Sequence, residues 1–461
     1  MAIPSDKTMT AIDEEKNIIQ CPAKADTRHN QNLFFLLMIA IMPVQLMPLV
    51  TTQIAPIPGF KLSNIIVLIP FLILLNDNNI WRTNDKLERV TLRIFAIYVL
   101  LFFVAFWRSI PNIGTFVALF PRFFATTPLG YALYEFITPM LFASSFLYVI
   151  KKMRTAEQLL QVCFAIGIGI FCLSTIFLVA VFLNPQLIST PNRAGMGQLC
   201  NDYLGMYYTD VGTMYLMSAP ILLYLALKRG AFWTLNFILA LIAVILVQAR
   251  TAMAIFAFGS IATLIVMGRT RVLLRMAPIV LTGVFVMLGP ILFRLLTLGI
   301  TGKYGFTWHF LLSGRDDLVW LPLLVEWWSV SSRFWFGAGL HGMLISEYLR
   351  MGAILPVAEA HNMFIELFLD YGILLTVAVI VAIVAWFIWA IRLGLKMHSG
   401  IYSVLVICVA SFFISGLTGR HFLPNVENML MFPILGILVN VARLKLYGSK
   451  KMPALPAAKS V

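Results

Sequence analysis

The chain has 461 residues, of which 60% are hydrophobic and only 12% are charged, and its mean hydropathy is +0.90. Soluble domains are about half apolar and about a quarter charged, so this composition excludes an ordinary soluble enzyme and predicts an integral membrane protein. The formal net charge of +14 is compatible with a nucleic-acid-binding protein, but the distribution of the charges along the chain argues against that class.

Apolar runs near the length that crosses a bilayer recur from residue 33 onward. There are twelve of them: 33–50, 60–75, 92–107, 130–150, 160–183, 211–227, 231–248, 252–268, 272–293, 371–391, 401–418 and 427–442. The predicted fold is therefore an all-α polytopic membrane protein with about twelve transmembrane helices. The first run follows a polar segment, residues 1–32, that does not resemble a signal peptide because it contains several acidic residues.

The distribution of lysine and arginine predicts an orientation. If the N-terminus is cytoplasmic and the spans alternate, 23 of the 34 basic residues fall on the cytoplasmic side. This is the positive-inside bias of membrane proteins, and anionic lipid on the inner face favours it, so no nucleic-acid partner is expected. The predicted regions are a cytoplasmic tail 1–32, a multi-spanning domain 33–442 with a large outer loop 294–370, and a cytoplasmic tail 443–461.

Few ionisable residues lie inside the predicted spans, and Glu135 is the clearest exception. An ion-coupled transporter usually holds such groups at mid-depth. Here the charged residues that are not on the cytoplasmic side lie in the outer loops. This distribution favours an enzyme that acts at the outer surface. The five cysteines form no disulfide framework and no Cys/His metal spacing.

The first motif is "QARTA", which places Arg250 in the outer turn between the runs 231–248 and 252–268. The simpler interpretation is an arginine that reaches the membrane interface. The positive-inside bias, however, disfavours an outer arginine in so short a turn. A guanidinium there could bind a phosphate through paired donors, which lysine cannot reproduce.

The second motif is "SGRDD", which contains a further outer arginine, Arg315, followed by Asp316 and Asp317. The two carboxylates could indicate a metal site. No third ligand is evident nearby, and adjacent carboxylates beside an arginine are more often a solvated, salt-bridged turn. We therefore expect no metal and no other cofactor.

The third motif is "FGAGLHG", residues 336–342, in which three glycines predict a tight loop with close backbone approach. His341 in this loop could be a second base, although a structural role is the simpler interpretation.

The stretch "EAHNMFIELFLDYGIL", residues 359–374, places His361 at the start of a predicted helix. Asn362, Glu366 and Asp370 follow at helical spacing and form one polar stripe. The helix could simply be amphipathic and interfacial, or the imidazole could face a ligand. Asn362 could cap the helix or orient the histidine.

Five motifs follow one another within residues 245–380: an outer arginine, Ser-Gly-Arg, Gly-x-Gly, His-Asn at a helix start and "DYGILL". In this order the chain resembles the O-antigen ligase and Wzy-type polysaccharide polymerase superfamily of bacterial inner membranes. The resemblance implies a GT-C-like, metal-independent, inverting glycosyltransferase. Its donor would be a glycan linked to undecaprenyl diphosphate, and its acceptor a sugar hydroxyl on a glycan or on lipid A-core at the periplasmic face.

Carried over residue by residue, the resemblance implies donor-diphosphate binding by Arg250 and Arg315 and general-base catalysis by His361. Asn362 would support the histidine. Arg193, in "TPNRAGMGQ", departs from the family pattern and is a further candidate for donor binding. No local residue separates a ligase from a polymerase. The alternative class is a flippase or exporter of lipid-linked oligosaccharide or polysaccharide.

Overall fold

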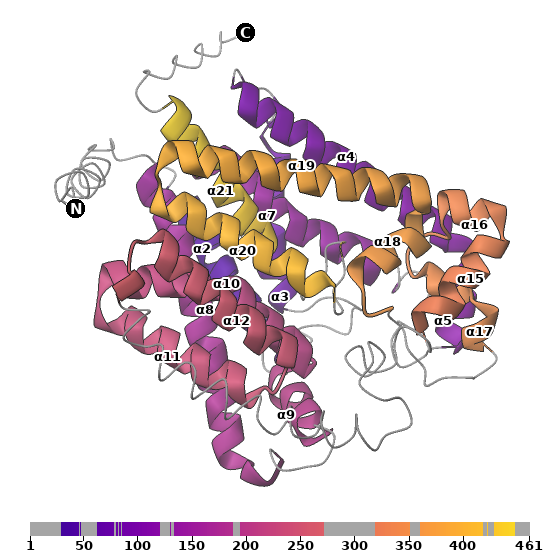
Figure 1. Ribbon diagram of the computed structural model, residues 1–461, viewed down its shortest axis with the longest axis horizontal. Helices are drawn as coiled ribbons and strands as arrows, with labels where there is room; N and C mark the ends of the chain where they lie inside the picture. Colours follow the sequence, from indigo (N-terminus) through magenta and orange to yellow (C-terminus); the bar gives the residue numbers. More distant parts are fainter. Residues whose placement is uncertain are drawn as a thin grey trace, which may run out of the picture.

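The computed structural model describes residues 29–45, 47, 62–77, 80–81, 83, 85–119, 130, 133–187, 194–271, 319–350, 360–417, 422 and 428–447. Every regular element within these residues is helical, so the described part of the chain has an all-α fold (Figure 1). Four helical segments are long and apolar enough to cross a membrane: Lys86–Ala118, Ala156–Leu183, Tyr208–Arg229 and Ile373–Met397. The class predicted from composition is thus supported.

Eleven of the twelve predicted apolar runs coincide with helices of the bundle. These are α2 (His29–Ile41), α3 (Leu62–Leu75), α4 (Lys86–Ser109), α7 (Thr138–Lys152), α8 (Ala156–Leu183), α10 (Tyr208–Arg229), α11 (Ala231–Leu246), α12 (Arg250–Val266), α19 (Ile373–Met397), α20 (Gly400–Gly416) and α21 (Met431–Tyr447). The run 272–293 lies outside the described residues. Because several of these helices are shorter than a full span, the count of twelve stays a prediction.

Helix α10 packs against α8, α11, α12 and α20, and small residues let helices of the bundle approach closely. A Cβ added to Gly212 of α10 would lie 2.8 Å from the Cβ of Ala252 in α12. A Cβ added to Gly436 of α21 would lie 2.7 Å from the Cβ of Val149 in α7. Close backbone approach at small residues is how helices pack in lipid, where water does not drive their association.

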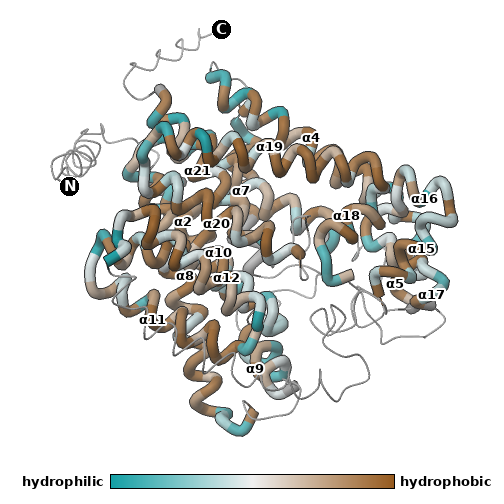
Figure 2. Tube along the Cα trace, in the orientation of Figure 1, coloured by the Kyte–Doolittle hydropathy of each residue, from teal (hydrophilic) through white to brown (hydrophobic). Residues whose placement is uncertain are grey.

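The outward surface of the bundle is apolar. Along α19, the side chains of Leu374, Val377, Val381 and Val384 are at least half exposed. Figure 2 shows α19 as hydrophobic over most of its length, with hydrophilic residues at the ends of the helices. A helix of 25 residues that exposes such a face is suited to lipid and not to water.

The described parts of the predicted loop 294–370 form, together with α5, a compact unit with a core of its own. We call this unit the loop domain. Its elements are α5 (Ile113–Leu119), α15 (Leu321–Ser329), α16 (Ser331–Phe336), η7 (Gly342–Ile345), α17 (Glu347–Arg350) and α18 (Met363–Tyr371). The Trp327 side chain is fully buried there, and its Nε1 donates a hydrogen bond to the carbonyl of Leu369 at 3.0 Å. Phe102 and Phe106, near the C-terminus of α4, belong to the same core.

The bundle has two distinct ends. The C-termini of α7 and α21 lie together, because Asn440 Nδ2 donates to the carbonyls of Val149 and Met153 at 2.7 and 2.8 Å. The N-terminus of α4 joins them through Glu88, which pairs with Arg443. We call this the charged end. The C-terminus of α4 lies at the opposite end, where it contacts the loop domain (Figure 1).

Two polar residues beside apolar runs have partners that hydropathy did not indicate. Glu135 lies in the π-helical segment Leu133–Ile137, which leads directly into α7, and it pairs with His341 of the loop domain. Helix α21 continues through Tyr447, so Arg443 lies on that helix, one residue beyond the predicted end of the apolar run at 442. Hydropathy alone shows neither where such a helix ends nor which partner its polar residues contact.

Candidate functional site

His361 lies at the junction between the two cores. Ala360, the residue before it, is fully buried in the core of the loop domain, whereas Met363 is fully buried in the core of the bundle. His361 itself is partly exposed and has a φ of 55°. Histidine adopts this left-handed conformation more readily than most residues other than glycine, asparagine and aspartate. The imidazole therefore belongs to a turn that buried residues hold on both sides.

Asn362 caps α18 and connects it to the bundle. Its Oδ1 accepts hydrogen bonds from the backbone N–H groups of Phe364 and Ile365 at 3.0 and 3.2 Å. Its Nδ2 donates to the carbonyl of Leu417, directly after α20, at 3.3 Å. The capping role considered from the sequence is therefore confirmed.

The polar stripe of α18 holds loop backbone in place. Glu366 Oε1 accepts from the N–H of Ala360 at 3.1 Å. Asp370 Oδ1 accepts from the N–H of Gly342 at 3.1 Å. The stripe that suggested an amphipathic interfacial helix thus serves, at these two positions, to anchor neighbouring turns.

Arg250 lies at the same end of the bundle as His361. It is exposed and is the first residue of α12. Helices α12 and α20 are antiparallel, since Gly259 contacts Ser411 and Gly400 contacts Met267. Arg250 lies nine residues before Gly259, and Leu417 lies six residues after Ser411. At about 1.5 Å per residue, Arg250 and Leu417 both lie about 9–14 Å from the Gly259–Ser411 contact, in the same direction along the bundle.

The position of Arg250 at the start of α12 favours an anion. The first backbone N–H groups of a helix have no partner within it, and the helix dipole places a partial positive charge there. A guanidinium at this position adds a full charge and paired donors, so the two contributions act together.

Two of the predicted donor-binding residues, Arg193 and Arg315, lie outside the described residues, as do Asp316 and Asp317. Helix α9 (Ala194–Leu204) begins directly after Arg193. Within the described ranges, no group of three or more histidine, cysteine, aspartate or glutamate residues is arranged to hold a metal ion.

Cys200, on α9, is fully buried. Burial raises the pKa of its thiol to about 12, and the neighbouring Asp210 carboxylate contributes in the same direction. Because only the thiolate is a strong nucleophile, this cysteine is not suited to covalent catalysis at neutral pH.

The glycine loop has the predicted close approach. A Cβ at Gly337, whose φ is +67°, would lie 2.3 Å from the backbone of Asp370. A Cβ at Gly339, whose φ is +91°, would lie 2.8 Å from the carbonyl of Ala105 in α4. The Arg108 guanidinium donates to the carbonyls of Phe336 and Gly337. Glycine is therefore required at both positions.

His341 connects this loop to the start of α7. Its Nε2 lies 3.1 Å from Glu135 Oε2, and both side chains are about one-fifth exposed. Its φ is 55°, as at His361. The contacts of His341 thus match the structural interpretation, since they join the loop domain to the bundle.

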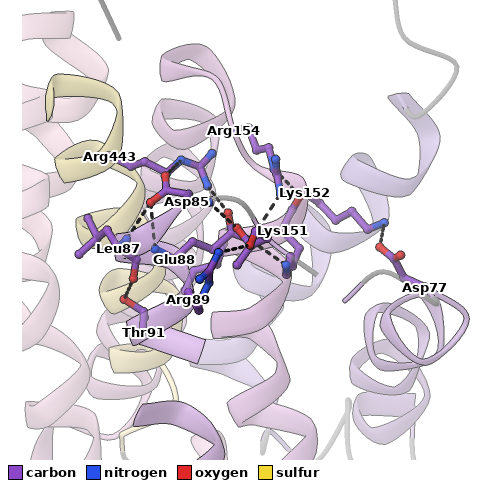
Figure 3. Close-up of polar contacts among 12 residues, drawn as sticks. Asp77, Asp85, Leu87, Glu88, Arg89, Thr91, Lys151, Lys152, Arg154 and Arg443 are labelled. Carbon is purple, nitrogen blue, oxygen red and sulfur yellow. Dashed lines mark hydrogen bonds and ion pairs between the residues drawn. The ribbon is translucent and has the colours of Figure 1, made fainter. Parts of the chain in front are cut away.

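A buried charged cluster at the opposite end of the bundle was missed by sequence reasoning (Figure 3). Glu88 is 1% exposed and lies at its centre. Its carboxylate is 2.7 Å from Lys151 Nζ, 3.0 Å from Arg443 Nη1 and 3.5 Å from Arg154 Nη2. Asp85 caps α4 and lies 3.7 Å from Arg443 Nε.

A signal for this cluster was present in the sequence. Gly436, Asn440 and Arg443 are spaced at i, i+4 and i+7, which puts a glycine, an amide and a guanidinium on one face of α21. That face packs against α7. Counting Arg443 as a tail residue concealed the pattern.

No protein-family model matches this chain, and a search of curated proteins finds none that is significantly similar. The class that the fold defines is an all-α protein with helices suited to a membrane.

Proposed function

We propose that this protein is a membrane glycosyltransferase of the O-antigen ligase or polysaccharide polymerase type. It would transfer a glycan from an undecaprenyl diphosphate-linked donor to a sugar hydroxyl. The observation that carries the proposal is the location of Arg250 and His361 at the same end of the bundle. The order of motifs along the chain supports the same class.

The proposed chemistry is a direct displacement. The acceptor hydroxyl oxygen forms a bond to the anomeric carbon, the bond from that carbon to the diphosphate oxygen breaks, and the hydroxyl proton passes to the imidazole of His361. Undecaprenyl diphosphate leaves with the bonding electron pair. Attack opposite the leaving group inverts the anomeric centre. Arg250, with the N-terminus of α12, would stabilise the charge that develops on the diphosphate.

The location of buried charge supports an enzyme over an ion-coupled transporter. Among the described residues, the charged side chains that are buried are Glu88, Lys151 and Arg443. All three belong to the cluster at the charged end, opposite the loop domain. Intramembrane proton or ion pathways usually place such groups at mid-depth.

The proposed orientation has both termini in the cytoplasm of a bacterial inner membrane and the loop domain in the periplasm. We expect a cysteine replacing the exposed Glu347 to react with a membrane-impermeant maleimide in spheroplasts, because the positive-inside bias favours this side. A cysteine replacing Ser460 should react only after the cells are lysed. Both variants are made in a chain whose five native cysteines are replaced. The reverse pattern would contradict the orientation.

The proposed activity is tested with purified protein in detergent micelles, a radiolabelled lipid-linked donor and a glycan acceptor. Transfer should proceed there, because a glycosyltransferase needs no second compartment. A flippase or exporter would leave the donor intact in micelles and would act only in sealed vesicles. Product size separates a ligase, which transfers one block, from a polymerase, which gives a ladder.

In this assay, Arg315→Lys should abolish most of the transfer although the charge is kept, since a point charge cannot reproduce a two-donor contact with phosphate. Arg250→Lys should have a similar but milder effect. Arg229→Lys, at the C-terminus of α10, is the matched control and should transfer glycan at the normal rate. Normal rates for both outer variants would remove these arginines from the donor site.

The same assay in excess EDTA tests whether the donor diphosphate is bound by arginines or by a metal ion. The wild-type rate should not change. A loss that Mg²⁺ restores would instead support a metal site at Asp316 and Asp317.

A further inference from the structure

The backbone of Ala360, directly before His361, is held at both of its polar atoms. The carbonyl accepts a 2.6 Å hydrogen bond from Trp320 Nε1, and the N–H donates a 3.1 Å hydrogen bond to Glu366 Oε1. The Ala360 side chain is fully buried in the loop-domain core. Both partners are side chains, contributed by different segments of the loop domain.

These bonds fix a turn that would not hold its shape alone. His361 is in the left-handed region, which is unfavourable for an L-residue and persists only where its surroundings determine it. On the far side, Asn362 caps α18 and is bonded to Leu417. Between Ala360 and Asn362, the backbone of His361 therefore has little freedom to rotate.

We propose that Trp320 and Glu366 are positioning residues for His361, which rests on the proposed function. They act through the backbone of Ala360 and aim the imidazole at the acceptor hydroxyl. Without either bond the turn relaxes, and a displacement of about 1 Å is enough to slow a proton transfer substantially. Donor binding is separate from this turn because Arg250 belongs to α12.

The role of Glu366 in this proposal is that of an acceptor, and its charge is not needed. Glutamine at this position keeps an oxygen that can accept from the Ala360 N–H, whereas leucine removes it. Glu366→Gln should therefore retain most of the wild-type kcat, and Glu366→Leu should lose it. A loss of the same size in both variants would show that the carboxylate itself is required and would overturn the proposed role.

Trp320→Phe keeps an aromatic ring and removes only the N–H donor. We expect kcat to fall about 10-fold while the KM for the lipid-linked donor stays unchanged. Trp328→Phe is the matched control, since Trp328 is 73% exposed on the neighbouring helix α15, and should behave as wild type. Thermal melting in detergent is measured alongside, so that kcat is expressed per folded molecule.

His361→Asn, measured in parallel, separates the two ways in which the idea can fail. If His361→Asn is inactive while Trp320→Phe and Glu366→Leu turn over at the wild-type rate per folded molecule, only the positioning role is overturned. If His361→Asn itself turns over normally, the proposed base is wrong and the positioning role falls with it. The positioning role is supported if Trp320→Phe and Glu366→Leu lower kcat and leave the donor KM unchanged. Glu366→Gln should then restore kcat.

Discussion

Replacing His361 is expected to lower the rate of glycan transfer by about 10²–10⁴-fold, the usual contribution of a general base. His361→Ala removes the imidazole but also places alanine in a left-handed turn. His361→Asn removes it with a residue that tolerates this conformation, so it isolates the chemistry from the backbone. Donor binding should survive in both variants, and a filter-binding assay with the lipid-linked donor measures it.

The pH dependence and a second histidine provide controls for this expectation. The wild-type rate should fall as pH drops through the titration of an imidazole, because an imidazolium has no lone pair to accept the acceptor's proton. His341→Asn should remain largely active, since His341 pairs with Glu135. The opposite result, an active His361→Asn protein at normal abundance, would leave His361 as an interfacial residue only.

Replacing Glu88 with leucine is expected to destabilise the protein by about 3–5 kcal/mol. The substitution leaves Lys151 and Arg443 buried without the carboxylate that lies 2.7 and 3.0 Å from them. An unfolding free energy is commonly only about 5–15 kcal/mol, so the variant should accumulate poorly in the membrane and aggregate on mild heating in detergent. Material that does fold should retain activity, because the cluster is at the end opposite Arg250 and His361.

Two further variants test the cause of that loss. Asp77→Asn breaks a more exposed pair, with Lys152 at 2.7 Å, and should cost about 1 kcal/mol or less. Replacing Glu88, Lys151 and Arg443 together with Leu, Met and Met should recover much of the lost stability, since no unpaired charge then remains in the cluster's centre. A Glu88→Leu protein that melts like the wild type would show that water reaches the cluster.

The helices of the bundle could be predicted because hydropathy is a local property. Runs such as 160–183 and 371–391 are apolar enough to specify a helix wherever they lie, and α8 and α19 coincide with them. The ends of the helices could not be placed this way. Glu135 lies near the start of the run 130–150 and Arg443 directly follows the run 427–442. Only their partners, His341 and Glu88, show where they belong.

The site was predictable in part. Helical spacing placed Asn362, Glu366 and Asp370 on one face of α18, and asparagine before an apolar run indicated a helix cap. Nothing in the spacing indicated that Glu366 would hold the N–H of Ala360 or that Trp320 would hold its carbonyl. Those bonds join residues 6 and 40 positions apart, and the second depends on how two segments of the loop domain fold together.

By itself the sequence determined the class of the protein, the positions of most helices and the glycines of the 336–342 loop, because hydropathy and backbone conformation are set by the residue and its neighbours. Tertiary structure decided which charges are buried, as at Glu88, and where the His361 turn lies between the two cores. The physical reason is that a charge is buried only when a partner arrives from another helix. That partner, Arg443 for Glu88, is 355 residues away in the chain.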